Sequence, residues 1–95
     1  MAKFIARINL DNFTKEISDK LLDRLQRLYV DSKIPDPITE ELFNLPVFEY
    51  YYDGDIEDIK YFHQLMLEAI KPIQENPLVI VYKVEEYFFT GLRNF

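Results

Sequence analysis

The chain has 95 residues, with 17 Asp and Glu against 11 Lys and Arg, a formal net charge of −6 and no cysteine. This length accommodates one domain, residues 1–95, and the lack of cysteine excludes disulfides, thiol nucleophiles and thiolate metal sites. The acidic balance argues against ordinary nucleic-acid binding, because Lys and Arg contacts to phosphates supply most of that affinity. No apolar run reaches membrane-spanning length, and the N-terminus lacks the apolar stretch of a signal peptide, so we expect a cytoplasmic protein.

The first predicted elements are a strand and a long helix. Residues 3–10 alternate, with apolar side chains at every even position, which is typical of a strand with one packed face. Asp11 and Asn12 are candidate cap residues for an amphipathic helix over about 13–30, in which apolar side chains recur every three to four residues. Its outer face carries opposite charges at i,i+4 spacing, as exposed helices do. These pairs are Glu16 with Lys20 and Asp23 with Arg27.

The helical pattern breaks at Asp31, and the prolines that follow impose an extended chain. Pro35 and Pro37 each restrict the residue before them to extended conformations. Asp36 with Pro37 matches an N-cap and first helical position, which predicts a short helix over 38–43.

A central strand is predicted over residues 47–52. Alternation across the pleat gives it an aromatic face that packs against helices and a mixed face that is partly solvated. Two of its three consecutive tyrosines therefore point inward and one points outward. The packed face would hold Phe48, Tyr50 and Tyr52, and the other face Val47, Glu49, Tyr51 and Asp53.

A turn and a second helix follow this strand. Residues 53–55 have turn chemistry, because Gly54 reaches positive φ without penalty and Asp bonds its own backbone. Asp55 is the expected N-cap of a helix that extends to about Ile73. Carboxylates in its first turn would complement the helix dipole. Those carboxylates are Glu57 and Asp58.

The last predicted element is the most apolar run of the chain. Residues 77–84 are the best candidate for the middle strand of the sheet. A strand continuing to Phe89 would exceed the usual length, so we expect a bulge, bend or break near Glu85 and Glu86. Residues 92–95 form a tail whose docking the pattern does not predict.

These elements predict an α+β two-layer sandwich in which two main helices cover one face of a three- to four-stranded sheet, in the order β-α-β-α-β. If residues 29–34 formed a strand, the order would be βαββαβ, the ferredoxin-like arrangement. We favour the first order because Leu28 and Tyr29 continue the helical stripe. The face without helices would mix apolar and charged side chains, as protein-binding faces do. In one register it would hold Lys3, Ile5, Arg7, Asn9, Val47, Glu49, Tyr51, Asp53, Val79, Val81, Lys83 and Glu85.

No catalytic signature is present. His63 is the only histidine, and we interpret it as an imidazole at the edge of the core, bonded to a backbone or tyrosine oxygen. A calcium loop starting at Asp53 would need Gly and Glu where the chain has Asp58 and Gln64. The three consecutive tyrosines lack the positive groove of a single-strand binder. We therefore predict no enzyme, no metal and no cofactor.

The negative charge is concentrated in one run of sequence. Between Lys33 and Lys60 there is no basic residue, and the acids there sum to −8, which exceeds the −6 of the whole chain. Spaced carboxylates can stand in for phosphates on a Lys/Arg surface. We therefore expect a non-enzymatic acidic protein-binding domain, an inhibitor or decoy that mimics nucleic acid on the basic surface of a nucleic-acid-binding protein. The expected contact residues are Glu40, Glu41, Glu49, Tyr51, Asp53, Asp55, Glu57 and Asp58.

The alternative is a homodimeric structural or scaffold module that pairs through its exposed sheet face or an edge strand. In that case the acids only solubilise loops and helix starts. We expect self-association, as a dimer, under either hypothesis.

Overall fold

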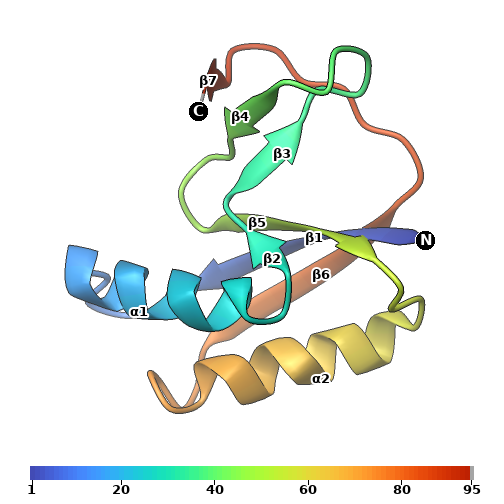
Figure 1. The fold of residues 1–95 in the computed structure, drawn as a ribbon. Helices are drawn as coiled ribbons and strands as arrows, with labels where there is room; N and C mark the ends of the chain where they lie inside the picture. Colours follow the sequence, from blue (N-terminus) through green and yellow to red (C-terminus); the bar gives the residue numbers. More distant parts are fainter. Residues whose placement is uncertain (95) are drawn as a thin grey trace.

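The computed structural model describes residues 1–94 and has two helices and two antiparallel sheets, so the chain is the predicted α+β domain (Figure 1). Helices α1 (Lys15–Gln26) and α2 (Ile59–Ile70) cover one face of the larger sheet. That sheet has the order β2-β5-β1-β6, formed by Val30–Asp31, Glu49–Gly54, Ala2–Asn9 and Leu78–Val84. The smaller sheet has the order β3-β4-β7, formed by Lys33–Pro35, Leu42–Asn44 and Arg93–Asn94.

The core lies between the larger sheet and the helices, and β1 is at its centre. The predicted first strand is confirmed, because every even-numbered side chain from Ala2 to Leu10 is buried. Phe4 pairs with Tyr52 across the β1–β5 ladder and stacks on Phe62 of α2, with ring centroids 4.6 Å apart. The helices add further buried side chains, which are Leu21 and Leu25 from α1 and Met66, Ala69 and Ile70 from α2.

Helix α1 is shorter than predicted at both ends. Thr14, rather than Asp11 or Asn12, is the N-cap, and its hydroxyl accepts a hydrogen bond from the Ile17 amide at 3.2 Å. At the other end Tyr29 has a φ of +62°, which stops the helix. The ion pairs on the outer face are confirmed, with distances of 3.4 Å for Lys20–Glu16 and 2.9 Å for Arg27–Asp23.

Val30 belongs to a strand instead of the helix, so the favoured order was wrong at this point. Val30 is fully buried and pairs with Tyr52 at the edge of the larger sheet. Within this sheet the elements follow the alternative order, β-α-β-β-α-β. Burial of Val30 in the sheet outweighs the helical periodicity that Leu28 and Tyr29 extend. The sequence did not reveal this strand, because two residues are too few to show an alternating pattern.

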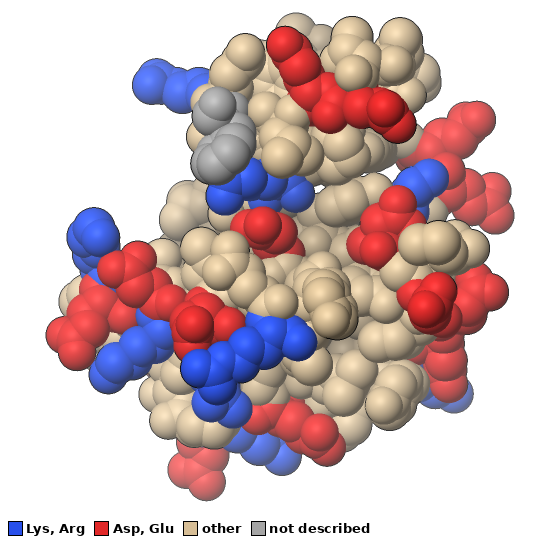
Figure 2. All heavy atoms as spheres, in the orientation of Figure 1, with Lys and Arg blue, Asp and Glu red and all other residues tan. Residues whose placement is uncertain are grey.

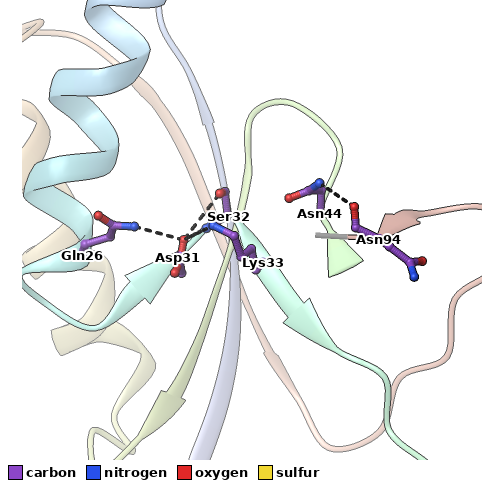
Figure 3. Close-up of polar contacts among 6 residues, drawn as sticks. All are labelled: Gln26, Asp31, Ser32, Lys33, Asn44 and Asn94. Atoms are coloured by element: carbon purple, nitrogen blue, oxygen red, sulfur yellow. Dashed lines mark hydrogen bonds and ion pairs between the residues drawn. The ribbon is translucent and has the colours of Figure 1, made fainter. Parts of the chain in front are cut away.

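Asp31 organises the passage from the larger sheet to the smaller one (Figure 3). Its carboxylate accepts hydrogen bonds from the Ser32 amide at 2.7 Å and from the Gln26 side chain at 3.4 Å, and the Lys33 ammonium lies 3.8 Å away. The same view shows Asn44 on β4, whose amide donates to the carbonyl of Asn94 on β7 at 3.3 Å. The C-terminal residues are thus tied into the smaller sheet, while the prediction for Phe95 lies outside the described residues.

The short helix predicted over 38–43 is a turn followed by β4. Asp36 does act as a cap, accepting from the amides of Ile38 at 2.8 Å and Thr39 at 3.0 Å. Glu40, however, has a φ of +65°, which reverses the chain so that the Asp36 amide donates to the Glu41 carbonyl at 2.8 Å. A hairpin between β3 and β4 replaces the helix because residues 42–44 pair with β3 and β7.

Strand β5 begins two residues later than predicted, since Val47 and Phe48 form a turn in which Phe48 has a φ of +75°. Its inward tyrosines are confirmed, but Tyr51 is also buried, at 7 % exposure. The predicted turn at Gly54 is instead the end of the strand. Gly54 does not have positive φ, and a Cβ there would lie 2.4 Å from the hydroxyl oxygen of Tyr52.

Helix α2 is capped by Asp58, so the prediction of Asp55 was wrong. The Asp58 carboxylate accepts from the Lys60 amide at 2.9 Å. The Tyr52 hydroxyl accepts from the Ile56 amide at 3.1 Å, so this amide is bonded to a side chain of β5 before the helix begins. The helix ends at Ile70 instead of Ile73. Within residues 1–94, neither helix has the length and apolar content that crossing a membrane requires.

Strand β6 is an edge strand and not the predicted middle strand. It pairs only with β1, which takes the central place beside β5. The predicted break is confirmed, because the strand ends at Val84. Residues 85–92, which we name the C-terminal strap, then leave the larger sheet on the side without helices and run past the β3–β4 hairpin to β7 (Figure 1). Phe89 of the strap packs edge-on against Phe43 of β4, with ring centroids 5.1 Å apart.

Candidate functional site

A cleft with a volume of about 400 Å³ lies where the larger sheet, the β3–β4 hairpin and the C-terminal strap meet. We name it the acidic cleft, because carboxylates from all three parts reach it. Its lining consists of Lys3, Pro35, Asp36, Pro37, Glu40, Tyr51, Asp53, Val84, Glu85, Glu86, Tyr87 and Phe88.

The antiparallel register explains why residues distant in sequence meet in this cleft. Lys3 on β1 lies opposite Asp53 on β5 and opposite Val84 on β6, so the three side chains share the face without helices. Tyr51 lies on the same face of β5, two residues before Asp53. The strap begins directly after Val84 and therefore starts at the rim of the cleft.

Tyr51 forms part of the floor of the acidic cleft. The C-terminal strap places the Tyr87 ring 5.8 Å from the Tyr51 ring, which is why the predicted outward tyrosine is buried. The Tyr51 hydroxyl is enclosed without a hydrogen bond of normal geometry in the described structure. Burial raises its pKa, and the neighbouring hydroxyl of Tyr87 and the carboxylate of Asp53 raise it further. Tyr51 therefore keeps its proton to a pH well above that at which an exposed tyrosine ionises.

The cleft is negatively charged. Five carboxylates and one ammonium, that of Lys3, line it, so its formal charge is −4. None of the five forms an ion pair within residues 1–94, where the ion pairs are on α1 and between Lys33 and Asp31. The amides of Thr39 and Ile38 lower the pKa of Asp36, which keeps that carboxylate ionised. The five carboxylates are Asp36, Glu40, Asp53, Glu85 and Glu86.

The predicted contact residues are divided between this cleft and other surfaces. Glu40, Tyr51 and Asp53 line the cleft. Four others lie outside it and are exposed, one on the β3–β4 hairpin and three in the loop before α2. Glu49 lies near the other end of β5, opposite Arg7. The four exposed residues are Glu41, Asp55, Glu57 and Asp58.

Sequence reasoning missed the part of the cleft that the strap supplies. Glu85 and Glu86 were predicted as a break in a strand, and Glu85 also as part of the open sheet face. Neither was predicted as a contact residue, although they are two acids beside an aromatic run. Asp36 had been interpreted only as a cap. Figure 2 shows the result: acidic side chains gather at the right of the view, whereas both charges alternate over α1 at the lower left.

The open sheet face differs from the predicted one. The β1–β6 register places Leu78, Ile80, Tyr82 and Val84 on this face, while Val79 and Val81 pack against the core. The strap and the smaller sheet cover the part over β5. An apolar strip of β6, consisting of the exposed Leu78, Ile80 and Tyr82, remains uncovered.

His63 has neither the partner that we predicted nor the surroundings of a catalytic base. It is half-buried in a shallow hollow with Ile59, Lys60 and Val81, and its imidazole makes no hydrogen bond within residues 1–94. In the same part of the chain, no three His, Cys, Asp or Glu side chains converge to hold a metal ion. The excess of carboxylates in the acidic cleft is suited to binding a cationic group.

Comparison of the chain with protein-family models, curated proteins and solved structures finds no match.

Proposed function

We propose that this chain is a non-enzymatic acidic protein-binding domain, an inhibitor or decoy that occupies the basic surface of a nucleic-acid-binding protein. One observation carries the proposal: within the described residues, none of the eight carboxylates between Lys33 and Lys60 forms an ion pair. Unpaired carboxylates keep the long-range field that draws a Lys/Arg surface toward them.

Neighbouring cations offset this charge only in part. The Lys83 ammonium donates to the Glu57 backbone carbonyl at 2.8 Å but forms no ion pair within the described residues. Lys3 lies opposite Asp53 and Arg7 lies opposite Glu49, but neither pair approaches to ion-pair distance. Glu85 and Glu86 add two more exposed acids to the same end of the molecule. A basic partner would therefore meet a surface on which acids clearly outnumber bases.

The test is capture of partners by the immobilised chain from cells that express it, at low and high salt. We expect a nucleic-acid-binding protein that is released as salt rises, because screening weakens attraction between exposed charges. Added nucleic acid should displace the chain from that partner. Retention of the same partners at low and high salt would contradict the proposal.

Charge reversal gives a matched control. Reversal of Asp53, Asp55 and Asp58 to Lys should abolish capture of the partner. The fold should remain, with a loss of stability of about 1 kcal/mol because the Asp58 cap is removed. Reversal of three acids on α1 changes the net charge equally and should leave capture intact. These acids are Glu16, Asp19 and Asp23. Equal loss in both variants would mean that only net charge matters, which would contradict a defined acidic site.

A second candidate function is a homodimeric module that pairs through β6. This strand has a partner on one side only, and three of its apolar side chains are exposed. An edge of unpaired amides and carbonyls accepts another strand, and a second copy offers a matching one. In antiparallel pairing about Val81, Ile80 would lie opposite Tyr82 of the second copy, and Lys83 opposite Val79, so no like charges would face each other.

The measurement for this candidate is the mass of the chain by light scattering. We expect a dimer that Ile80→Lys converts to a monomer, because the new charge lies at the pairing edge. Val47→Lys is the control, since Val47 is an exposed apolar residue in the turn before β5. A strict monomer at high protein concentration would contradict the dimer.

A further inference from the structure

We infer that helix α2 forms the second layer of a homodimer interface: a second copy of this chain packs the same side of its α2 against this one, while the two β6 edges pair beside them. The inference rests on the second candidate function, the homodimer through β6, and names the rest of that interface. Three observations carry it: an unprotected strand edge, a partly exposed side of α2 over that edge, and a spacing of elements that fits both layers at once.

Strand β6 lacks the features that keep a strand edge from pairing. Proteins protect such edges with proline, bulges, charges or very short strands. β6 has seven residues in unbroken register with β1, no proline, no glycine and one charge, that of Lys83. The Lys83 ammonium is held by the Glu57 carbonyl at 2.8 Å. The other edge strand of this sheet, β2, has only two residues, so β6 is the long edge that remains open.

The strand edge by itself is too small for a stable dimer. Its seven residues make a surface about 24 Å long and about 10 Å deep, whereas each partner of a stable interface buries about 800 Å². Side chains on both sides of the edge must therefore take part. On the open face these are the exposed Leu78, Ile80 and Tyr82. On the other face they come from α2, which runs alongside β6 (Figure 1).

The side of α2 over the β6 edge is only partly covered. Leu65 marks the opposite side, because it lines the hollow between the two helices with Arg24 of α1. His63 and Leu67 stand two positions before and after Leu65, so a turn of about 100° per residue places both on the side away from α1. His63 shares a hollow with Val81 of β6, which puts this side over the strand. Both side chains are half-buried, and the His63 imidazole makes no hydrogen bond within residues 1–94.

The spacing of the elements lets both layers meet their copies together. Helix α2 packs on β1 through the rings of Phe62 and Phe4, 4.6 Å apart, and on β6 beside Val81, so it lies over this pair of strands. Because neighbouring strands are about 4.8 Å apart, two copies joined at β6 would hold their α2 axes about 10 Å apart. Packed helices are separated by about 8–10 Å. The two α2 helices therefore touch when the strands pair, without any movement in either copy.

The charges across the twofold axis favour a second copy over an unrelated partner. Pairing about Val81 brings the two His63 side chains together, and a neutral imidazole has one donor and one acceptor nitrogen, so the pair can share a hydrogen bond. The two helices run antiparallel, so the exposed Glu57 before one helix lies near the exposed Lys71 at the end of the other. Opposite charges and opposite dipole ends then meet. Lys60, which also lines the hollow, is exposed and can extend into solvent.

Cysteine cross-linking tests the contact on the intact chain, which has no cysteine of its own. Helix axes about 10 Å apart place facing Cα atoms about 5 Å apart, a separation that a disulfide spans. We expect His63→Cys to give a disulfide-linked dimer on mild oxidation, measured on a non-reducing gel. Tyr61→Cys is the control, because Tyr61 is exposed on the same side of α2 as Leu65, and it should give no cross-link. No cross-link in His63→Cys, or equal cross-linking of the two variants, would overturn the inference.

A charge placed on this side of α2 should separate the copies. Leu67→Glu should weaken the dimer about tenfold or more in a dilution series followed by light scattering, because pairing would bury the new carboxylate. Tyr61→Glu adds the same charge on another side of the helix and should leave the dimer unchanged. Thermal unfolding checks that both variants are folded, and the cross-linking result decides if Leu67→Glu is not.

The outcomes separate this inference from the proposed functions. A dimer that Ile80→Lys dissociates and Leu67→Glu does not would overturn the α2 contact and leave pairing through β6 intact. A native chain that is a strict monomer at high concentration would overturn both. The decoy function is independent of either result, because the acids proposed to bind a basic partner remain in Leu67→Glu and salt-sensitive capture should persist.

Discussion

The hydroxyl of Tyr87 donates a hydrogen bond to the carbonyl oxygen of Pro35, a residue 52 positions earlier in the chain. This bond fixes the C-terminal strap to the end of β3, where the turn of the β3–β4 hairpin begins. It holds the Tyr87 ring over Tyr51 and so converts an open sheet face into a cleft.

Removal of this bond should loosen the strap. Tyr87→Phe deletes the hydroxyl, leaves the ring and deprives the Pro35 carbonyl of its donor, so we expect the free energy of unfolding to fall by about 1 kcal/mol. Urea unfolding measures the change. Tyr82→Phe alters an exposed hydroxyl and should stay within about 0.5 kcal/mol of the native chain. Equal effects in the two variants would mean that the bond to Pro35 contributes nothing.

Alkaline pH should destabilise the chain through its buried tyrosines. Burial raises the pKa of Tyr50, Tyr51 and Tyr87 above the ordinary value of 10.0. The folded state then holds these protons more tightly than the unfolded chain, so their contribution to stability is complete below about pH 10 and is lost as the pH rises further.

Urea unfolding at a series of pH values, with tyrosinate absorbance recorded in parallel, measures this dependence. Tyr51→Phe should make the alkaline loss less steep. Tyr61→Phe removes an exposed tyrosine of α2 and should leave the slope as it is. Stability that stayed level through the alkaline range would refute the prediction.

Arg24 links the two helices. Its Nε donates to the carbonyl of Ala69 in the last turn of α2, where carbonyls lack helical partners. Arg24→Met keeps the apolar stem and removes the donor, so we expect a loss of about 2 kcal/mol, as for a hydrogen bond to a charged group. Arg27→Met removes only the exposed ion pair with Asp23 and should cost less than about 1 kcal/mol. Denaturant unfolding compares them, and a larger loss for Arg27 would contradict this assignment.

Gly54 should tolerate no larger residue while Tyr52 keeps its hydroxyl. Gly54→Ala places a Cβ 2.4 Å from the Tyr52 hydroxyl oxygen, and we expect a loss of about 2 kcal/mol from this overlap. In a double-mutant cycle, Tyr52→Phe should recover part of the loss, because it deletes the nearest atom. Gly91→Ala, which meets no atom within 4 Å, should show no coupling to Tyr52. Additive effects of Gly54→Ala and Tyr52→Phe would argue against the overlap.

The two aspartates near the start of α2 should differ in their effect on stability. Asp58→Ala removes the cap of the Lys60 amide and should cost about 1 kcal/mol. Asp55→Ala removes an equal charge from an exposed position outside the helix and should stay within about 0.5 kcal/mol. Thermal unfolding decides between them, and the reverse order would restore Asp55 as the cap.

Where a pattern depends on neighbouring residues, the sequence predicts this fold well. The alternation over β1 and the charge pairs on α1 are both confirmed, because each is a local period within one segment. The caps at Thr14 and Asp58 were each misplaced by a few residues. Helix ends depend on competing backbone bonds, such as that from Ile56 to the Tyr52 hydroxyl.

The candidate site was predictable only in part. The excess of acids and the tyrosine strand are visible in composition and spacing, and they direct attention to Glu40, Tyr51 and Asp53. The pairing of these residues with Glu85 and Glu86 was not predictable, because no local period connects residues that lie more than thirty positions apart.

By itself, the sequence determined the α+β class, the inward side chains of β1 and the location of the negative charge, since these follow from residue types and their spacing along the chain. Only the tertiary structure decided that Val30 is a strand, that β6 lies at an edge and that Tyr51 is buried. Each of these depends on which distant segment covers a surface, and an exposed face becomes a cleft only when the C-terminal strap folds back across it.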